Sequence, residues 1–186
     1  YEESLTLLKK AQVYPDNLGE GKLYGAQEND IFFWMGCVFE KTGNRDAATT
    51  YWKKAAVGIS EPAPAIFYND QQPDKIFYQA EALKKLGARD EAETRCRKLI
   101  EYGEQHLDRT VKTDFFAVSL PDLMIFTDDL SKRNNIHCYY LMGLGHLGLG
   151  DFGKAVTCFD QIMLLEPAHT GVSIHRKLLH KRIAAF

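Results

Sequence analysis

The sequence predicts an all-α fold built from stacked pairs of helices. A pattern occurs three times in which two stretches with apolar residues at helical spacing flank a turn glycine, at Gly43, Gly87 and Gly150. Between these stretches we find no alternation of strands with helices. Small residues also occupy matching positions in the first helix of each pair, where two helices must approach closely: Gly36, Ala80 and Gly143.

Three degenerate helix pairs are predicted, over about residues 29–57, 73–101 and 136–167. In the second pair, Pro73 fits the first helical position because its missing N–H would have no partner there. Asp74 in the first turn suits the positive end of the helix dipole. These start signals support a helix that begins at the proline.

The third pair carries the most complete motif. It reads Tyr139, Met142 and Gly143, then Gly150-Asp151, then Ala155, Phe159, Ile162 and Pro167. This pattern resembles the tetratricopeptide repeat (TPR), a helix-turn-helix unit of about 34 residues. The resemblance implies a right-handed superhelix whose concave groove, lined by the first helix of each pair, binds peptides or partner domains. On that resemblance the following residues would lie near the groove: Asn29, Phe33, Gly36, Gln79 and Leu83.

The spacing of the turn glycines indicates two insertions. Gly43 and Gly87 are 44 residues apart, and Gly87 and Gly150 are 63 apart, whereas an uninterrupted array would give about 34. We therefore predict insertions over residues 58–72 and 102–134. Insertions in repeat proteins map to loops on one face, often the binding face.

Further helices are predicted at the two ends of the chain. A helix over 2–13 is expected to be the second helix of a preceding partial repeat, which would make the chain a fragment of a longer protein. A C-terminal helix over 170–185 is expected to cap the stack, with the basic residues from His175 to Arg182 on its solvated face. Together these elements predict a single TPR-like domain over residues 1–186.

A second resemblance spans nearly the whole chain. Its segments are Tyr14–Gly21, Gly25–Asp30, Phe67–Lys75 and Ala117–Leu123. They are similar to the C-terminal region of large bacterial proteins that join an N-terminal β-sandwich domain of unknown function, with carbohydrate-enzyme character, to such repeats. The resemblance implies that this chain packs against, or completes, a larger sugar-related protein.

Composition narrows the class of partner. The 186 residues are 45% hydrophobic and 26% charged, with a net charge of −2, so no basic excess points to nucleic acid. No apolar run approaches the roughly 18 residues of a membrane span. The four cysteines form no C-x-x-C pair and are expected to be small buried residues in a reducing compartment. We therefore expect a cytoplasmic protein that binds neither nucleic acid nor membrane.

A literal G-x-G-x-x-G motif occurs at Gly143, Gly145 and Gly148. Dinucleotide binding would need a strand, a turn and a helix at this place, and the helix-pair pattern argues against it. Because each additional helical glycine costs about 1 kcal/mol relative to alanine, Gly145 and Gly148 predict a close helix–helix approach, here suggested to be against the second insertion. No histidine pair has metal-binding helical spacing, so no metal or other cofactor is expected.

Carboxylates and amides cluster near the helix starts and the first insertion. Asn and Asp favour such places for capping and turn hydrogen bonds, but a polar site in the groove or a partner contact would use the same residue types. Both interpretations stay open. The candidate interaction residues are Glu28, Asn29, Asp30, Phe33, Tyr68, Asn69, Asp70, Gln71, Gln72, Asp74 and Gln79.

The leading functional prediction is a non-catalytic scaffold for protein association. Its partner would be a protein or peptide, including the N-terminal part of the same polypeptide, and its insertions should leave an open groove. The alternative is part of a carbohydrate-active enzyme, in which Glu28, Asp30, Asp70 or Asp74 would line a site completed by a missing N-terminal domain. A third hypothesis is homo-oligomerisation through the stacked ends.

Overall fold

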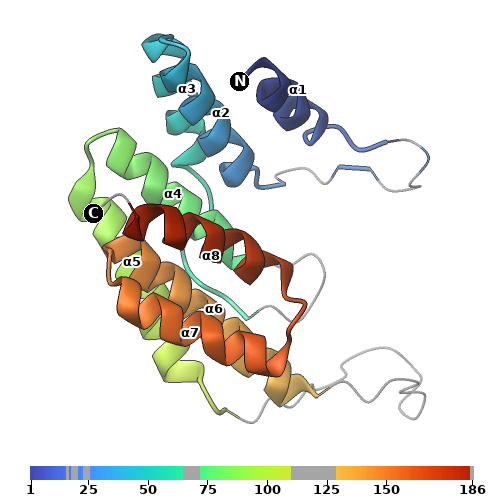
Figure 1. Cartoon of the computed structure of the whole chain (residues 1–186), viewed down its shortest axis with the longest axis vertical. Coiled ribbons are helices and arrows are strands. Elements are labelled where there is room, and N and C mark those ends of the chain that lie inside the picture. The colour runs from blue at the N-terminus through green and yellow to red at the C-terminus, as the bar shows by residue number, and fades with distance from the viewer. Residues whose placement is uncertain (16, 18–20, 23–25, 65–71, 110–128, 185–186) are drawn as a thin grey trace.

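The computed structural model confirms the all-α prediction. It describes residues 1–15, 17, 21–22, 26–64, 72–109 and 129–184, and within these ranges it contains helices and no strand. None of the described helices is both long and apolar enough to cross a membrane. The helices, shown in Figure 1, are α1 Glu2–Lys10, α2 Asn29–Lys41, α3 Arg45–Ala55, α4 Pro73–Lys85, α5 Arg89–His106, α6 Leu130–Leu149, α7 Phe152–Leu165 and α8 Thr170–Ile183.

The predicted turn glycines lie between the helices of each pair. Gly43, Gly87 and Gly150 have φ angles of +83°, +86° and +82°, in the left-handed region that glycine adopts without steric cost. In the first and third pairs a side chain caps the start of the second helix. Asn44 Oδ1 accepts the backbone N–H of Ala47, and Asp151 Oδ1 accepts that of Lys154. The chain thus reverses in a few residues, and α2 packs against α3, α4 against α5, and α6 against α7.

The small residues fit large partners on the second helix of the pair. A Cβ atom on Gly143 would lie 2.5 Å from Phe159 Cε1, and one on Gly36 would overlap the Trp52 indole. Phe159 and Trp52 follow their glycines by the same 16 residues. The glycine therefore makes room for a buried ring, which contributes roughly 1.5–3 kcal/mol through burial.

The two additional glycines of α6 lie against α5. A Cβ on Gly145 would lie 2.6 Å from the Cys96 carbonyl oxygen, and one on Gly148 would overlap Cys96 Sγ. The predicted close approach is confirmed, and among the described residues the neighbour is α5; most of the second insertion, the neighbour suggested from the sequence, lies outside the described residues. Gly143, Gly145 and Gly148 all lie inside one helix, so they form no phosphate-binding turn.

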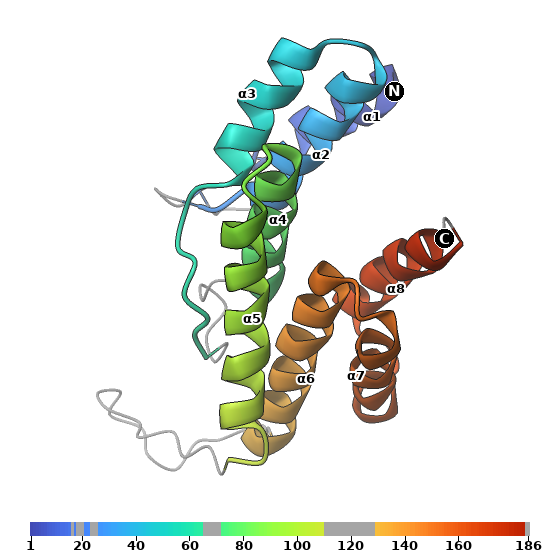
Figure 2. The same cartoon turned by 90° about the vertical axis from the view of Figure 1, so that its left-hand side faces the viewer.

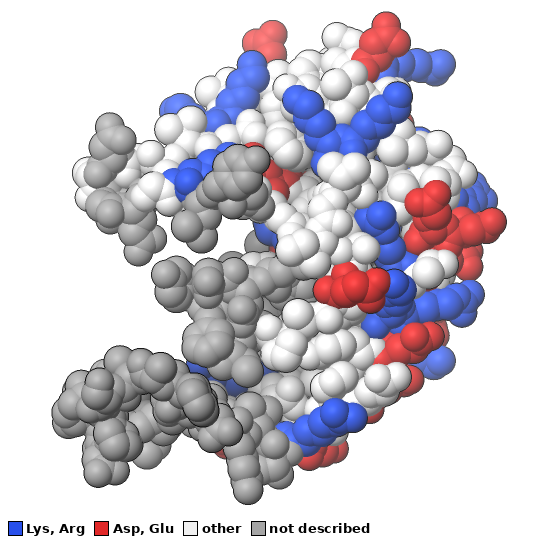
Figure 3. All heavy atoms as spheres, turned by 180° about the vertical axis from the view of Figure 1, so that it is seen from behind, with Lys and Arg blue, Asp and Glu red and all other residues white. Residues whose placement is uncertain are grey.

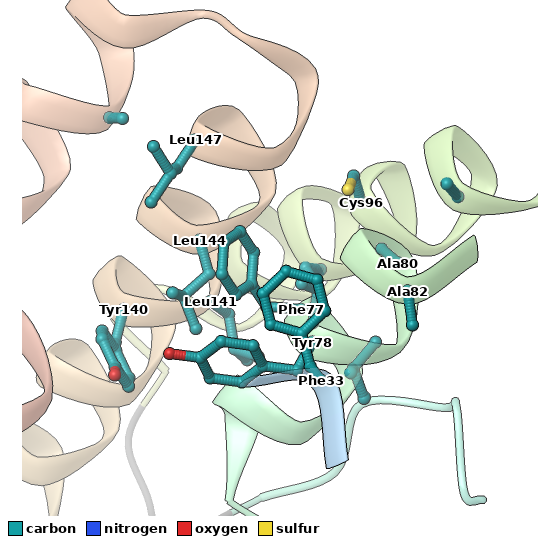
Figure 4. Close-up of a cluster of buried hydrophobic side chains, with 14 of the residues drawn as sticks. Phe33, Phe77, Tyr78, Ala80, Ala82, Cys96, Tyr140, Leu141, Leu144 and Leu147 are labelled. Carbon is teal, nitrogen blue, oxygen red and sulfur yellow. The ribbon is translucent and has the colours of Figure 1, made fainter. Parts of the chain in front are cut away.

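Helix α4 lies at the centre of the molecule and contacts α2, α3, α5 and α6. Its side chains Phe77 and Tyr78 are buried beside Leu141 and Leu144 of α6, and Phe33 reaches the same cluster from α2 (Figure 4). The core therefore runs through neighbouring pairs as one body, as expected for units that cannot bury their apolar faces alone.

The C-terminal helix α8 packs on α7 and α6, as Figures 1 and 2 show, and its side chains reach α4. Arg182 forms an ion pair with Glu81 of α4 and donates to the Leu147 carbonyl of α6 at 3.2 Å. His175, only 1% exposed, meets the Phe77 ring edge-on at 5.3 Å. The expected solvated basic face is thus wrong for His175 and Arg182, because both face the body of the protein.

The described part of the first insertion runs over three helices. Gln79 Nε2 of α4 donates to the Ile59 carbonyl at 3.0 Å, Lys98 of α5 pairs with Glu61, and His137 Nε2 of α6 donates to the Ala63 carbonyl at 2.9 Å. Residues 58–64 therefore tie the second and third pairs together.

The ends of the second insertion are helical. Helix α5 extends to His106 and α6 begins at Leu130. Asn135 exchanges two hydrogen bonds with Asp108, and Asn134 Nδ2 donates to the His106 carbonyl at 2.7 Å. These bonds hold the end of α5 against the start of α6.

Candidate functional site

Among the described residues, two clefts lie beside α8. The first, here called the polar cleft, has a volume of about 420 Å³ and lies between the start of α4, the first half of α6 and the start of α8. The second, the apolar cleft, has a volume of about 700 Å³ and lies between α1, α2 and the end of α8. Two of the predicted interaction residues, Gln72 and Asp74, line the polar cleft, whereas the apolar cleft contains none of them.

Tyr140 lines the polar cleft and is paired with a buried histidine, His175. The Tyr140 hydroxyl is 2.9 Å from His175 Nδ1, which is also 2.8 Å from the Gly171 carbonyl. His175 Nε2 is buried and has no hydrogen-bond partner in the described part of the chain. Burial lowers the pKa of His175 to about 4, because an apolar environment disfavours the charged form. The imidazole is therefore neutral at pH 7.

Asp74 places a carboxyl group at the start of α4. Burial raises its pKa, with Lys75 acting in the opposite direction. Its Oδ1 is buried and finds no hydrogen-bond donor among the residues that the structure describes. Lys75 Nζ instead lies 2.5 Å from Asp30 Oδ1. Asp30, Asp74 and Lys75 thus form one charged cluster that joins α2 to α4.

Glu28 belongs to a separate contact. Its carboxylate lies 2.5 Å from Lys22 Nζ and accepts a hydrogen bond from Gln12 Nε2 at 3.1 Å. These contacts hold the segment between α1 and α2. Glu28 therefore lies apart from the Asp30–Asp74 cluster, and the predicted carboxylates do not all converge on one place.

All five predicted groove residues are buried inside the fold. Phe33 and Leu83 are part of the hydrophobic core, and Gly36 lies against Trp52. Asn29 Nδ2 donates to the Ala55 and Val57 carbonyls, both at 2.7 Å, which fixes the end of α3 against the start of α2. Gln79, 0% exposed, bonds Ile59 and accepts from Arg95 Nη1 at 2.6 Å. The side-chain amides of Asn29 and Gln79 therefore form hydrogen bonds within the fold.

The remaining predicted residues, Tyr68, Asn69, Asp70 and Gln71, lie outside the described residues. Gln72 is exposed at the rim of the polar cleft, directly before α4.

Sequence reasoning missed the apolar cleft. Trp34 lines this cleft, is 37% exposed, and lies edge-on to Phe33 at 5.2 Å and to Tyr78 at 6.2 Å between ring centroids. Helix α1 forms one wall, has no buried residue, and leaves Leu7 58% exposed. The run Phe32-Phe33-Trp34 was the available signal, because three consecutive aromatic residues on a helix cannot all face the same core.

The charged side chains of the described residues are mixed in sign. Figure 3 shows Lys and Arg interspersed with Asp and Glu over the face that it presents, without a uniformly basic area among the described residues there. Several of these charges form ion pairs on the surface, such as Lys85 with Glu40 and Arg97 with Glu93.

A comparison with known protein families gives a match for the third helix pair. A family model described as tetratricopeptide repeat matches residues 136–169, which cover α6 from Ile136 onward and all of α7. No solved structure matches the chain. With its helix pairs, turn glycines and small–large contacts, the protein has a TPR-like all-α fold. TPR units are typical of protein-interaction scaffolds and typically carry no catalysis.

Proposed function

We propose that this chain is a scaffold for protein association and is not itself an enzyme. The apolar cleft carries the proposal: exposed Trp34 and Leu7 face a volume of about 700 Å³ between three helices. Aromatic and aliphatic side chains held in a concave site are the usual anchors of protein interfaces. The partner is a separate protein or peptide, or the N-terminal part of the same polypeptide.

The state of the cysteines supports a cytoplasmic location for this association. All four are free thiols, with Cys96 and Cys138 buried, and unpaired thiols are typical of reducing compartments.

Site-specific crosslinking tests the scaffold proposal. A photoreactive amino acid is placed at Leu7 in the apolar cleft and, as the matched control, at exposed Lys154 on α7. We expect a discrete protein adduct from position 7 in cells that express the protein, and reconstitution of the same adduct from the two purified components. Equal adducts at both positions, or none at position 7, would overturn the proposal.

One observation favours the carbohydrate-enzyme alternative. Asp74, whose pKa is raised by burial, lines the polar cleft together with Glu166 and His169. A carboxyl group with a raised pKa is suited to protonate a leaving group, and a second carboxylate is needed for hydrolysis of a glycoside. Asp74→Asn in the full-length protein should then lower glycoside hydrolysis at least a hundredfold, and unchanged hydrolysis would exclude this role.

A further inference from the structure

We propose that the apolar cleft binds an amphipathic helix of a protein partner, with acidic residues beside the apolar stripe of that helix. The inference rests on the proposed scaffold function and names the chemistry of the partner.

The walls of the cleft have the shape that accepts a helix. On α2, Trp34, Val38 and Lys41 follow at spacings of four and three residues, which places them on one face. On α1, Ser4 lines the facing wall together with Leu7 and Leu8, which follow it by three and four residues and so share its face. Two neighbouring helices that each present such a row leave a groove between them, into which the side chains of a third helix can pack.

Trp34 is the expected anchor of this contact. Its ring is held edge-on against Phe33 and Tyr78, and yet more than a third of its surface is exposed. A large ring that is already fixed loses little conformational entropy on binding, which is why tryptophan is enriched among residues that dominate interface energies.

The charged residues that line the cleft favour a partner helix with side chains of the opposite charge. Lys41 and Lys181 line the cleft from α2 and α8, and no acidic residue lines it among the described residues. Neither lysine forms an ion pair with another described residue. Acidic side chains on the bound helix would meet these two cations, whereas lysines would be repelled.

Helix α8 provides a precedent within the same molecule. Its Val172 and Leu179 are buried in the hydrophobic core, and Arg182 on the same helix pairs with Glu81 of α4. Elsewhere in the molecule, one helix is thus already held by buried apolar residues together with an ion pair. In the apolar cleft the cations belong to the scaffold, so the acids must come from the partner.

A displayed library of helices tests the inference with the whole chain as bait. Its members have about 20 residues, long enough for helix formation in water, with a stripe varied among Leu, Ile, Phe and Met and flanks varied among Glu, Lys and Gln. We expect the selected helices to carry Glu at the flanks. Fluorescence anisotropy then measures the affinity of one selected peptide for each variant.

The variants separate the apolar and the charged contributions. Leu7→Asp should abolish binding, and the combined change Lys41→Glu with Lys181→Glu should weaken it roughly tenfold. Lys53→Glu combined with Lys132→Glu, an equal charge change at exposed positions of α3 and α6, should leave the affinity unchanged. Circular dichroism confirms that each variant is folded.

Three results would overturn the inference. The first is selection of neutral or basic helices, and the second is binding that survives Leu7→Asp. The third is a concentration-dependent dimer that Leu7→Asp converts to a monomer, because a second copy of the chain would then occupy the cleft. If crosslinking at Leu7 succeeds while no acidic helix is selected, the scaffold function stands and the acidic partner does not. If both fail, both proposals fail.

Discussion

The contact between α5 and α6 can be tested by a double-mutant cycle at Gly148 and Cys96. In Gly148→Ala the new methyl group would overlap Cys96 Sγ. Overpacking of this kind costs about 1–3 kcal/mol, and the better helix propensity of alanine returns about 1 kcal/mol. We therefore expect the free energy of unfolding to fall by up to about 2 kcal/mol.

Removal of the sulfur should relieve this overlap. Without Sγ, the nearest atoms to the new methyl group would be Cys96 Cβ at 3.6 Å and Phe77 Cδ2 at 3.8 Å, both ordinary contacts. Cys96→Ala alone should cost about 1–2 kcal/mol, since it leaves a small cavity. The double variant should be more stable than the sum of the single effects by about 1–2 kcal/mol.

Gly145→Ala is the matched control on the same helix. Its methyl group would meet the Cys96 backbone carbonyl at 2.6 Å, which Cys96→Ala does not remove, so this pair should be additive within about 0.5 kcal/mol. Gly153→Ala on α7 has nothing within 4 Å and should not destabilise. Urea unfolding followed by circular dichroism measures all of these variants. Additivity at Gly148 and Cys96, or coupling at Gly145, would refute the assigned contact.

Three further predictions follow from the buried polar groups. The pKa of His175 is about 4 in the fold against 6.5 for the free side chain. As the pH falls, His175 is therefore protonated in the unfolded chain before it is protonated in the folded protein. Stability should therefore fall by up to about 3 kcal/mol as the pH drops from about 6.5 to 4, and His175→Gln should remove this part of the dependence. Gln79→Leu should cost about 1–3 kcal/mol in urea unfolding, because the Ile59 carbonyl and the Arg95 guanidinium lose a partner. Thiol labelling should modify partly exposed Cys158 long before buried Cys96; burial raises the pKa of both thiols to about 11, so access of the reagent sets the difference in rate.

Each of these expectations has a contrary result. If His175→Gln kept the full acid dependence, the neutral buried imidazole would not be its source, and His146 and His169, whose pKa values burial also lowers, would be tested next. If Gln79→Leu left the free energy of unfolding unchanged, the hydrogen bonds of Gln79 would make no net contribution to stability. Equal labelling rates for the two thiols in the native protein would contradict the packing of α5 against α6.

The helix pairs could be predicted because their signals are local. The glycine turns, Pro73 at a helix start and the small residues at Gly36 and Gly143 each act within one pair, so sequence spacing is enough to find them. Even the closeness of α6 to a neighbour followed from Gly145 and Gly148. Which neighbour it was could not be read from the sequence, because Cys96 is distant along the chain and chemically unremarkable.

The candidate site was harder to predict because polar residues serve two purposes. Asn29 and Gln79 resemble groove residues in type and position, but each satisfies backbone carbonyls that would otherwise be buried without a partner. In the sequence, His175 and Arg182 look like part of a solvated helix face. Their partners lie in α4, far away along the chain: Glu81, the partner of Arg182, is 101 positions before it. The packing of α8 on the rest of the protein shows that His175 and Arg182 face inward, and sequence spacing alone does not reveal this packing.

The ion pair between Arg182 and Glu81 has a consequence for how the molecule unfolds. In a simple solenoid each unit contacts only its neighbours, so stability is a sum along a line and the ends can melt alone. Here α8 contacts α4 as well as the adjacent third pair, and the contact closes a loop of 101 residues. Loss of α8 removes contacts from two units at once. We therefore expect hydrogen exchange in α4, α6 and α8 to occur in one cooperative opening, with no fraying inward from the C-terminus.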